Sequence, residues 1–224
     1  EINPLKVYII DNYIYGVDFK SNFNIYDLEN GKLINSIELF TKKNKNIPIP
    51  TSMSLYDNHF IIGFKTGKVI KINREGKIIW EYKHDKILTS PIKIFKQNLI
   101  ILYGDTIKLL SIENGKELLS ETYEGSNILN SKGGSIEEFA NILYFILPNS
   151  SLAEIDSFFN KKIYSNFANN NFQDSINNNA DEIHIFDNYI SYFDNNLYLY
   201  CFDIYSDKFV LNERKISNVN SFKF

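Results

Sequence analysis

The sequence is poor in the residue that crosslinks protein chains. It has one cysteine, Cys201, among 224 residues, which excludes an internal disulfide. Because Cys201 falls in the apolar run 197–202, we expect a buried small hydrophobe rather than a reactive thiol. The absence of disulfides fits the cytoplasm and many periplasmic proteins alike, so it leaves the compartment open.

Arginine, excess positive charge and long apolar runs are also scarce. The only arginines are Arg74 and Arg214, and 24 basic residues against 27 acidic ones give a net charge of −3. Nucleic-acid binding proteins need a basic surface, so we predict no nucleic-acid partner. No apolar run approaches the roughly 18 residues of a membrane helix, and we predict no transmembrane segment in this chain.

Turns, by contrast, recur at regular intervals. One series is centred on Asn12, Asn58, Asn98, Asn141 and Asn188, and a second on Gly31, Gly76, Gly115, Asn160 and Asp207. The first series is spaced by 46, 40, 43 and 47 residues and the second by 45, 39, 45 and 47. Periods of about 40–47 residues with several short strands are typical of β-propeller blades. The repeats therefore predict an all-β propeller.

The third repeat shows the predicted strands most clearly. Four strands are expected at residues 91–95, 99–103, 107–112 and 117–123. The Asn114–Gly115 pair predicts a type I′ hairpin turn, with positive φ at both residues. In repeats four and five the second turn has Asn160 and Asp207, which also tolerate the left-handed region. Residues 135–140 are interpreted as a first strand or an irregular turn.

The chain is predicted to be a single propeller over residues 1–224. The predicted four-stranded blades are residues 4–47, 48–88, 89–130, 131–178 and 179–218, with 219–224 as the first strand of a further blade. A β-sandwich is the alternative, but it does not predict turns at a blade-length period.

Two features lead us to expect part of a larger ring of seven or eight blades. Residues 220–224 resemble residues 90–94, the start of a blade, and the chain begins at Glu1 with Met53 as its only methionine. A closed ring of five blades is the alternative, because propellers of four to eight blades are known.

One repeat carries a more specific motif. Residues 63–72 read Gly-Phe-Lys-Thr-Gly-Lys-Val-Ile-Lys-Ile, and residues 76–81 read Gly-Lys-Ile-Ile-Trp-Glu. This Gly-x-x-x-Gly hairpin, strand and Gly-Lys-x-x-Trp sequence resembles the repeat of the pyrroloquinoline-quinone-like propeller superfamily. Residues 31–35 and 115–119 keep the Gly-Lys start. By period, the resemblance covers the whole chain.

The resemblance implies two kinds of function. Quinoprotein dehydrogenases bind the quinone and Ca²⁺ with an aspartate base, acidic and amide calcium ligands and often a vicinal disulfide. With one cysteine and one tryptophan, this chain lacks that disulfide and most docking tryptophans, and no residue can be assigned as a catalytic base. BamB-like subunits of the outer-membrane barrel-assembly machinery are instead non-enzymatic, eight-bladed periplasmic scaffolds held by a lipidated N-terminal cysteine.

Candidate metal-binding and catalytic side chains are scattered. The three histidines, His59, His84 and His184, lie in different repeats without ligand spacing, so no metal site is predicted. His84 and Asp85 are interpreted as a solvated loop, and His184 as a packing residue. Aspartates near turns are expected to bond turn backbone rather than Ca²⁺, which needs several converging oxygens. They are Asp11, Asp57, Asp105, Asp187 and Asp194.

The remaining motifs are interpreted as structural. Gly63, Gly67 and Gly104 are hairpin glycines, because no Gly-Lys-Ser/Thr helix start follows them, and no Gly-x-Ser-x-Gly elbow is present. Trp80 is expected to anchor neighbouring blades. The connection 41–50, with its Lys-Lys-Asn-Lys-Asn run and two prolines, is basic and extended. It is expected to be a solvated loop, with an acidic partner as the alternative. The second long connection, 167–181, is Asn-rich.

These observations favour a non-catalytic protein-interaction scaffold of the cell envelope, BamB-like, that assists outer-membrane β-barrel assembly. We predict a periplasmic monomer with a protein partner, no catalytic residue, no metal and no cofactor, attached to the outer membrane by a lipidated N-terminus that this chain lacks. The partner-binding surface is not predicted. The alternatives are a fragment of a quinone-dependent dehydrogenase and a propeller that binds a small ligand or glycan.

Overall fold

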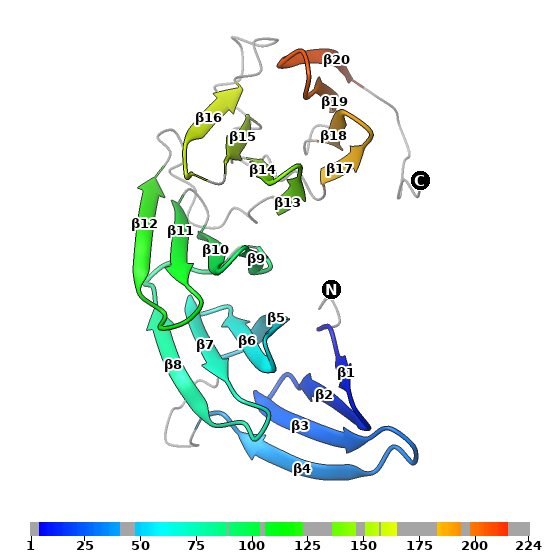
Figure 1. Cartoon of the computed structure of the whole chain (residues 1–224), viewed down its shortest axis with the longest axis vertical. Helices are drawn as coiled ribbons and strands as arrows, with labels where there is room; N and C mark the ends of the chain where they lie inside the picture. The colour runs from blue at the N-terminus through cyan, green and yellow to red at the C-terminus, as the bar shows by residue number, and fades with distance from the viewer. Residues whose placement is uncertain are drawn as a thin grey trace. The chain divides into compact units, whose positions relative to one another are not determined.

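The fold is built from strands throughout the part of the chain that the structure describes. The computed structural model describes residues 5–40, 48–88, 90–103, 106–122, 136–146, 151–156, 158–164, 183–193 and 198–214. Within them, twenty strands form five antiparallel sheets of four, and each sheet follows chain order (Figure 1). Each sheet is one propeller blade, so the predicted all-β propeller of four-stranded blades is confirmed.

The chain divides into two compact units, Glu1–Thr122 and Tyr123–Phe224. The first unit holds blades 1 to 3. Their strands are β1 (Tyr8–Ile10), β2 (Tyr13–Val17), β3 (Asn22–Asp27), β4 (Leu33–Glu38), β5 (Pro50–Tyr56), β6 (His59–Phe64), β7 (Lys68–Ile72), β8 (Ile78–Lys83), β9 (Lys93–Phe95), β10 (Asn98–Tyr103), β11 (Thr106–Ser111) and β12 (Glu117–Thr122).

The second unit holds blades 4 and 5. Their strands are β13 (Ile136–Phe139), β14 (Ile142–Ile146), β15 (Leu152–Ile155), β16 (Lys161–Tyr164), β17 (Ile183–Phe186), β18 (Tyr189–Phe193), β19 (Tyr198–Asp203) and β20 (Lys208–Arg214). The segment for which a strand or an irregular turn was predicted, 135–140, contains strand β13. In both units the fourth strand of each blade is an edge of its sheet.

Type I′ geometry occurs at the first hairpin turn of two blades rather than at Asn114–Gly115. The two-residue loops Asp57–Asn58 and Ala140–Asn141 have positive φ at both positions, between 44° and 63°. Of the Asn114–Gly115 pair only Gly115 has positive φ, at 71°. The type I′ prediction there was wrong because the loop is longer than two residues: the Ser111 amide donates to the Lys116 carbonyl, 2.9 Å away.

In blades 1, 2 and 4 the turn between the third and fourth strands is fixed by a side chain that the sequence analysis did not single out. Asp27 accepts hydrogen bonds from two turn amides, and Asn73 accepts one from Lys77 N at 2.8 Å. Asp156 has the same role in blade 4, where Phe159, with φ of 65°, takes the left-handed position predicted for Asn160. That prediction was off by one residue, whereas Asp207, with φ of 56°, confirms the prediction for blade 5.

Neighbouring blades pack through faces that alternate along each strand. Tyr15, Val17 and Phe23 of blade 1 pack against Phe60 and Ile62 of blade 2, all buried. Ile61, which lies between Phe60 and Ile62 on β6, points to the opposite face of the sheet and joins a second cluster. This cluster also contains Val69, Trp80, Leu99, Ile101 and Tyr103. In the second unit, Tyr144, Leu152, Tyr192, Tyr200 and Phe202 make the corresponding contact between blades 4 and 5.

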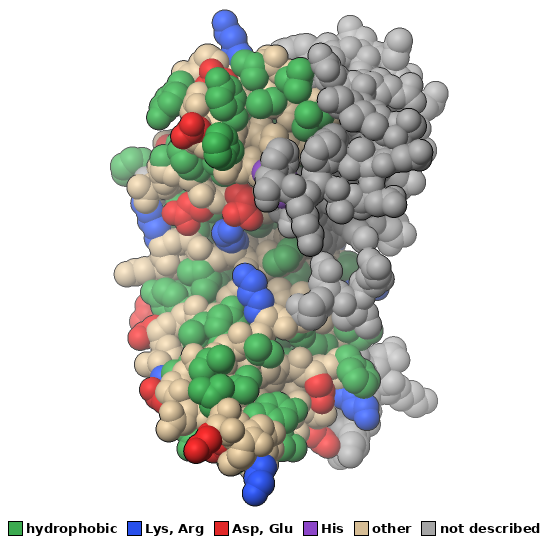
Figure 2. Space-filling model, turned by 90° about the vertical axis from the view of Figure 1, so that its right-hand side faces the viewer, with side chains coloured by type: hydrophobic (Ala, Val, Ile, Leu, Met, Phe, Trp, Pro, Cys, Tyr) green, Lys and Arg blue, Asp and Glu red, His purple; other side chains and the backbone are tan. Residues whose placement is uncertain are grey.

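The outer edge strands of four blades share a β-bulge that places an aliphatic side chain in solvent. The extra residues are Ile34, Ile79, Leu118 and Val210, with exposures of 57%, 48%, 54% and 55%. A bulge twists an edge strand and hinders its pairing with another sheet edge. Figure 2 shows hydrophobic side chains on the described surface of the molecule, interspersed with charged ones.

Several predicted segments lie outside the described residues. They include the Lys-rich run 42–46, the Asn-rich connection 167–181, Gly104 with Asp105, Asp194, and the strand predicted at 219–224. Across the described ranges, no helix has the length and apolar character required to cross a membrane.

Candidate functional site

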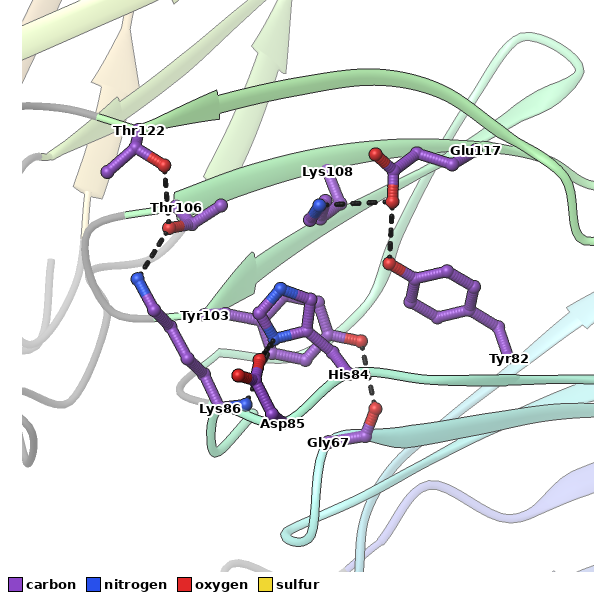
Figure 3. A network of polar contacts seen from close by, with 10 residues as sticks. All are labelled: Gly67, Tyr82, His84, Asp85, Lys86, Tyr103, Thr106, Lys108, Glu117 and Thr122. Atoms are coloured by element: carbon purple, nitrogen blue, oxygen red, sulfur yellow. Dashed lines mark hydrogen bonds and ion pairs between the residues drawn. The ribbon is translucent and has the colours of Figure 1, made fainter.

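A network of polar side chains lies between blades 2 and 3 in the first unit (Figure 3). We call it the polar junction. Its members are Tyr82 on β8, His84 and Lys86 after β8, Tyr103 on β10, Lys108 on β11 and Glu117 on β12. The hydrogen bond from Tyr82 to Glu117 connects strands of different sheets. The geometry of the polar junction decides whether it is a reactive site or a structural joint.

Glu117 is the acceptor at one end of the polar junction. Its Oε2 accepts a hydrogen bond from the Tyr82 hydroxyl at 2.8 Å and an ion-paired one from Lys108 Nζ at 3.0 Å. Burial alone would raise the pKa of the Glu117 carboxyl, but these two donors outweigh it and hold the pKa below its ordinary value. Burial and the Glu117 carboxylate both raise the pKa of Tyr82, so its hydroxyl stays protonated.

Tyr103, a residue of blade 3, donates a second hydrogen bond between the blades, this time to blade 2. Its hydroxyl donates to the Gly67 carbonyl at 3.0 Å, and its ring is 1% exposed. Burial raises the pKa of Tyr103 far above its ordinary value. The His84 imidazole stacks on this ring, with centroids 4.4 Å apart and an interplanar angle of 16°.

His84 is therefore not the solvated loop residue predicted. Its side chain is 14% exposed, whereas that of Asp85 is 92% exposed, so the prediction was right for Asp85 only. His84 Nδ1 lies 3.0 Å from the Lys86 amide, which donates to it, and 3.0 Å from Oδ1 of Asp85. Burial, followed by the charge of Lys108, lowers the pKa of His84, and the nearby Asp85 carboxylate opposes this shift only in part.

We expect the lowered pKa of His84 to make the first unit less stable in mild acid. Below pH 6.5 the unfolded chain takes up a proton on His84 before the folded chain does, so the free energy of unfolding falls as the pH drops. Urea unfolding followed by Trp80 fluorescence at pH 7.5 and pH 5.5 measures this. His84→Phe keeps the ring stack and removes the titration. An equal loss of stability in both proteins would contradict the prediction.

Trp80 and a glycine make the apolar part of the same joint. Trp80 Nε1 donates to the Ile112 carbonyl at 3.1 Å, and the buried Lys71 ammonium donates to the same oxygen at 3.1 Å. Gly115 lies directly on the indole, because a Cβ there would be 2.7 Å from Trp80 Cε3. The prediction that Trp80 anchors neighbouring blades is confirmed.

A similar contact joins blades 4 and 5 within the second unit. The Tyr164 hydroxyl donates to Asp207 at 3.0 Å, and Lys162 forms an ion pair with the same carboxylate. Burial would raise the pKa of Asp207, but the hydrogen bonds from Lys162, the largest effect, and from Tyr164 hold it below its ordinary value. A tyrosine on an outer strand that donates to a carboxylate of the next blade is thus a recurrent joint. Tyr82 follows the turn residue Gly76 by six positions and Tyr164 follows Asn160 by four, so no fixed spacing in the sequence marks this joint.

The remaining predicted residues do not come together into a site. Asp11 forms an ion pair with Arg74 of blade 2 at 2.9 Å rather than a turn bond. His59 Nδ1 lies 2.7 Å from the Asp57 carbonyl, in the same turn. His184 lies on β17, in the other unit. Within the described ranges, no three His, Cys, Asp or Glu side chains are grouped closely enough to hold a metal ion.

The second unit contains an open cavity of about 1150 Å³. Residues of β13, β17, β18 and β19 line it, together with Tyr205 from the turn before β20. Cys201 is one of the lining residues and is half-buried rather than fully buried as predicted. Burial, with the charge of Asp203, raises the pKa of its thiol, so it is a poor nucleophile at neutral pH, as predicted.

The cavity does not fit pyrroloquinoline quinone, the cofactor that the resemblance implies. The quinone carries carboxylates, yet the described lining residues include Glu137, Glu138 and Asp187, and none of those described is a lysine, arginine or tryptophan. Like charges would repel, and no described lining residue offers an indole on which the quinone ring could stack. No catalytic step through the quinone is therefore derived for this cavity.

Comparison with known proteins identifies the fold and no closer relationship. No protein-family model matches the sequence, and no curated protein sequence matches it. The structure of BamB from Moraxella catarrhalis is similar over 93% of this chain, with a TM-score of 0.68 and 12% identity. Quinohemoprotein alcohol dehydrogenase from Comamonas testosteroni is similar over 96%, with a TM-score of 0.67 and 14% identity. The computationally designed protein Ika8 is similar over 94% of this chain, with a TM-score of 0.64 and 14% identity.

These similarities confirm the resemblance to the pyrroloquinoline-quinone-like propellers at the level of the fold. The chain spans 61% of the BamB chain, 61% of the designed chain and 43% of the dehydrogenase chain. At identities of 12–14% the similarity concerns the backbone arrangement, and the functions of these proteins are not carried over with it.

Proposed function

We propose that this chain is a non-catalytic scaffold of the cell envelope that binds other proteins and assists assembly of outer-membrane β-barrels, as a BamB-like subunit. The observation that carries the proposal is the similarity to BamB over 93% of the chain. We further propose that the five blades belong to one propeller over residues 1–224, which acts in the periplasm, where it can meet barrel-forming clients.

The chemistry of the polar junction supports a scaffold. Its tyrosines keep their protons because burial raises their pKa values, and its carboxylate is engaged by Tyr82 and Lys108. General acid–base catalysis needs a group that exchanges protons near the working pH and faces the substrate. Glu117, Tyr82 and Tyr103 instead hold two blades together, so this cluster stabilises the scaffold.

The quinone-dependent dehydrogenase is the alternative, supported by the similarity to the alcohol dehydrogenase. Equilibrium dialysis with pyrroloquinoline quinone and Ca²⁺ separates it from the scaffold. We expect no saturable binding, because the described residues that line the cavity of the second unit include three carboxylates and neither lysine nor arginine. Saturable binding would favour the dehydrogenase.

A binding experiment with purified components tests the scaffold directly. The chain would be mixed with barrel-assembly machinery stripped of its own propeller subunit, and the mixture separated by size-exclusion chromatography. The proposal expects co-elution with the machinery, whereas an unrelated propeller of similar mass should elute alone. If the chain and the unrelated propeller both elute free, the barrel-assembly function is contradicted.

A further inference from the structure

The cavity of the second unit follows the inner edge of blade 5. The first strands of blades 4 and 5, β13 and β17, lie side by side (Figure 1). Residues of both strands line the cavity, and so do Ser191 and Cys201, which are direct partners across β18 and β19. Their side chains lie on the face of blade 5 that is turned away from blade 4, because the neighbouring Ile190 and Tyr200 belong to the core cluster. A cavity with walls on both sides of β17 passes along the edge of that strand.

The inner edge of β17 presents backbone hydrogen-bonding groups. The two-residue loop 187–188 joins β17 to β18, and the residues that flank such a loop, Phe186 and Tyr189, form a hydrogen-bonded pair. Pairs alternate along an antiparallel ladder, so the N–H and C=O groups of Ile185 point away from β18, toward the open edge of the sheet. Among the described residues, no backbone hydrogen bond outside the ladder involves Ile185. This position therefore offers a donor and an acceptor to an added strand.

The inner edge of blade 5 lacks the feature that protects the outer edges. The outer strands β4, β8, β12 and β20 carry β-bulges, which hinder the addition of another strand. The ladder between β17 and β18 instead runs through four consecutive pairs without a shift in register. A segment that enters the cavity can therefore continue this sheet without distortion of β17.

Exposed aromatic rings lie beside this edge. Phe186 is 78% exposed, Tyr205 is 83% exposed and Tyr189 is 39% exposed, and all three line the cavity. As cross-strand partners, Phe186 and Tyr189 share the face that is turned away from blade 4. The turn that carries Tyr205 is held by its own amide, which donates to Asp203 Oδ1 at 3.0 Å. Exposed rings in fixed positions suit the apolar or aromatic side chains of a partner.

We propose that an extended segment of a partner protein binds in this cavity as an antiparallel strand added to β17. The backbone of the segment would pair with Ile185, and every second side chain, apolar or aromatic, would cover Phe186 and Tyr189. The cavity volume of about 1150 Å³ exceeds the about 300–1,000 Å³ of small-molecule sites, which favours a peptide of several residues. The inference names the kind of segment that a protein-binding scaffold would take, and so it rests on the proposed function.

Backbone methylation of a model peptide tests the strand addition without any change to the protein. The probe is fluorescein-labelled Ser-Thr-Phe-Thr-Phe-Thr-Ser, and its fluorescence anisotropy is followed as the full chain is added. Paired residues share a face, so the threonines would pair with Ile185 and direct their N–H groups at β17, while the phenylalanines cover the rings. Methyl groups on the threonine nitrogens should weaken binding at least about ten-fold, and methyl groups on the phenylalanine nitrogens by less than about two-fold. Equal affinities of the three peptides would overturn the proposal.

Variants at two exposed phenylalanines assign the binding to the cavity. Phe186→Ser removes a ring from the lining, and we expect it to bind the unmethylated peptide at least about ten-fold more weakly. Phe158→Ser is the matched control, because Phe158 is 82% exposed and precedes β16 in the same unit but is not one of the described lining residues. It should bind like the unsubstituted chain, and circular dichroism checks that both variants fold. Equal affinities of the two variants would contradict a site at β17.

Protection of Cys201 gives a second readout at the same place. Cys201 is the only thiol in the chain and lines the cavity. The unmethylated peptide should slow its labelling by N-ethylmaleimide at least about five-fold, whereas the peptide with methylated threonines should not. The assay contains only the chain and a peptide, so its result is separate from co-elution with the barrel-assembly machinery. Co-elution without peptide protection overturns this inference alone, and protection without co-elution contradicts the barrel-assembly function alone.

Discussion

Replacing Trp80 with alanine should destabilise the first unit by about 3–5 kcal/mol, the usual cost of removing a large buried aromatic ring. The indole is 9% exposed and packs among side chains of blades 2 and 3. The substitution removes this contact, the bond from Nε1 to the Ile112 carbonyl, and the surface on which Gly115 rests. Because Trp80 is the only tryptophan, urea unfolding of the variant must be followed by circular dichroism.

Trp80→Phe is the matched control. It keeps an aromatic ring between the blades but loses the Nε1 donor, so it should cost less than the alanine variant. An unfolding midpoint that is unchanged by Trp80→Ala would show that the indole is not part of the core.

Gly115→Ala should destabilise the first unit by about 2–5 kcal/mol, for two separate reasons. The backbone φ of 71° lies in the left-handed region, which costs a residue with a Cβ about 1–2 kcal/mol. The new Cβ would also lie 2.7 Å from Trp80 Cε3, and overpacking of this kind costs about 1–3 kcal/mol. Chemical unfolding of the two proteins measures the difference.

Gly31→Ala separates these two costs. Gly31 occupies the equivalent turn of blade 1 with φ of 67°, but nothing lies within 4 Å of the position of its Cβ. It should therefore cost only about 1–2 kcal/mol, the left-handed contribution. In a Trp80→Ala background, Gly115→Ala should fall to the same value, because the clash is gone. Equal costs for Gly115→Ala with and without the indole would contradict the proposed contact between blades.

The period of the turns was enough to predict the blades. Asn58 and Asn141 lie in two-residue type I′ loops, and Gly31, Gly76 and Gly115 have the positive φ that their turns require. These are local requirements of the backbone, so a single sequence displays them. Phe159 escaped prediction because a phenylalanine with φ of 65° has no propensity for that position, and the bonds to Asp156 hold the turn there instead.

Contacts between blades were harder to predict. Trp80 could be recognised as an anchor, because a lone large aromatic residue in an edge strand usually packs against a neighbour. The stacking of His84 on Tyr103 joins residues in two different blades, and no local pattern encodes it. The cavity could not be predicted for the same reason. Glu137 and Asp187 are fifty residues apart in the sequence, and only the packing of β13 beside β17 brings them to one surface.

Crosslinking in the native envelope tests the scaffold function most directly. The full-length protein would be captured from crosslinked envelope extract, and its partners and contact sites identified by mass spectrometry. We predict enrichment of barrel-assembly subunits, with crosslinks that start from surface lysines of the blades. If these subunits are absent while the captured protein is folded and crosslinks to other envelope components, the barrel-assembly function is contradicted.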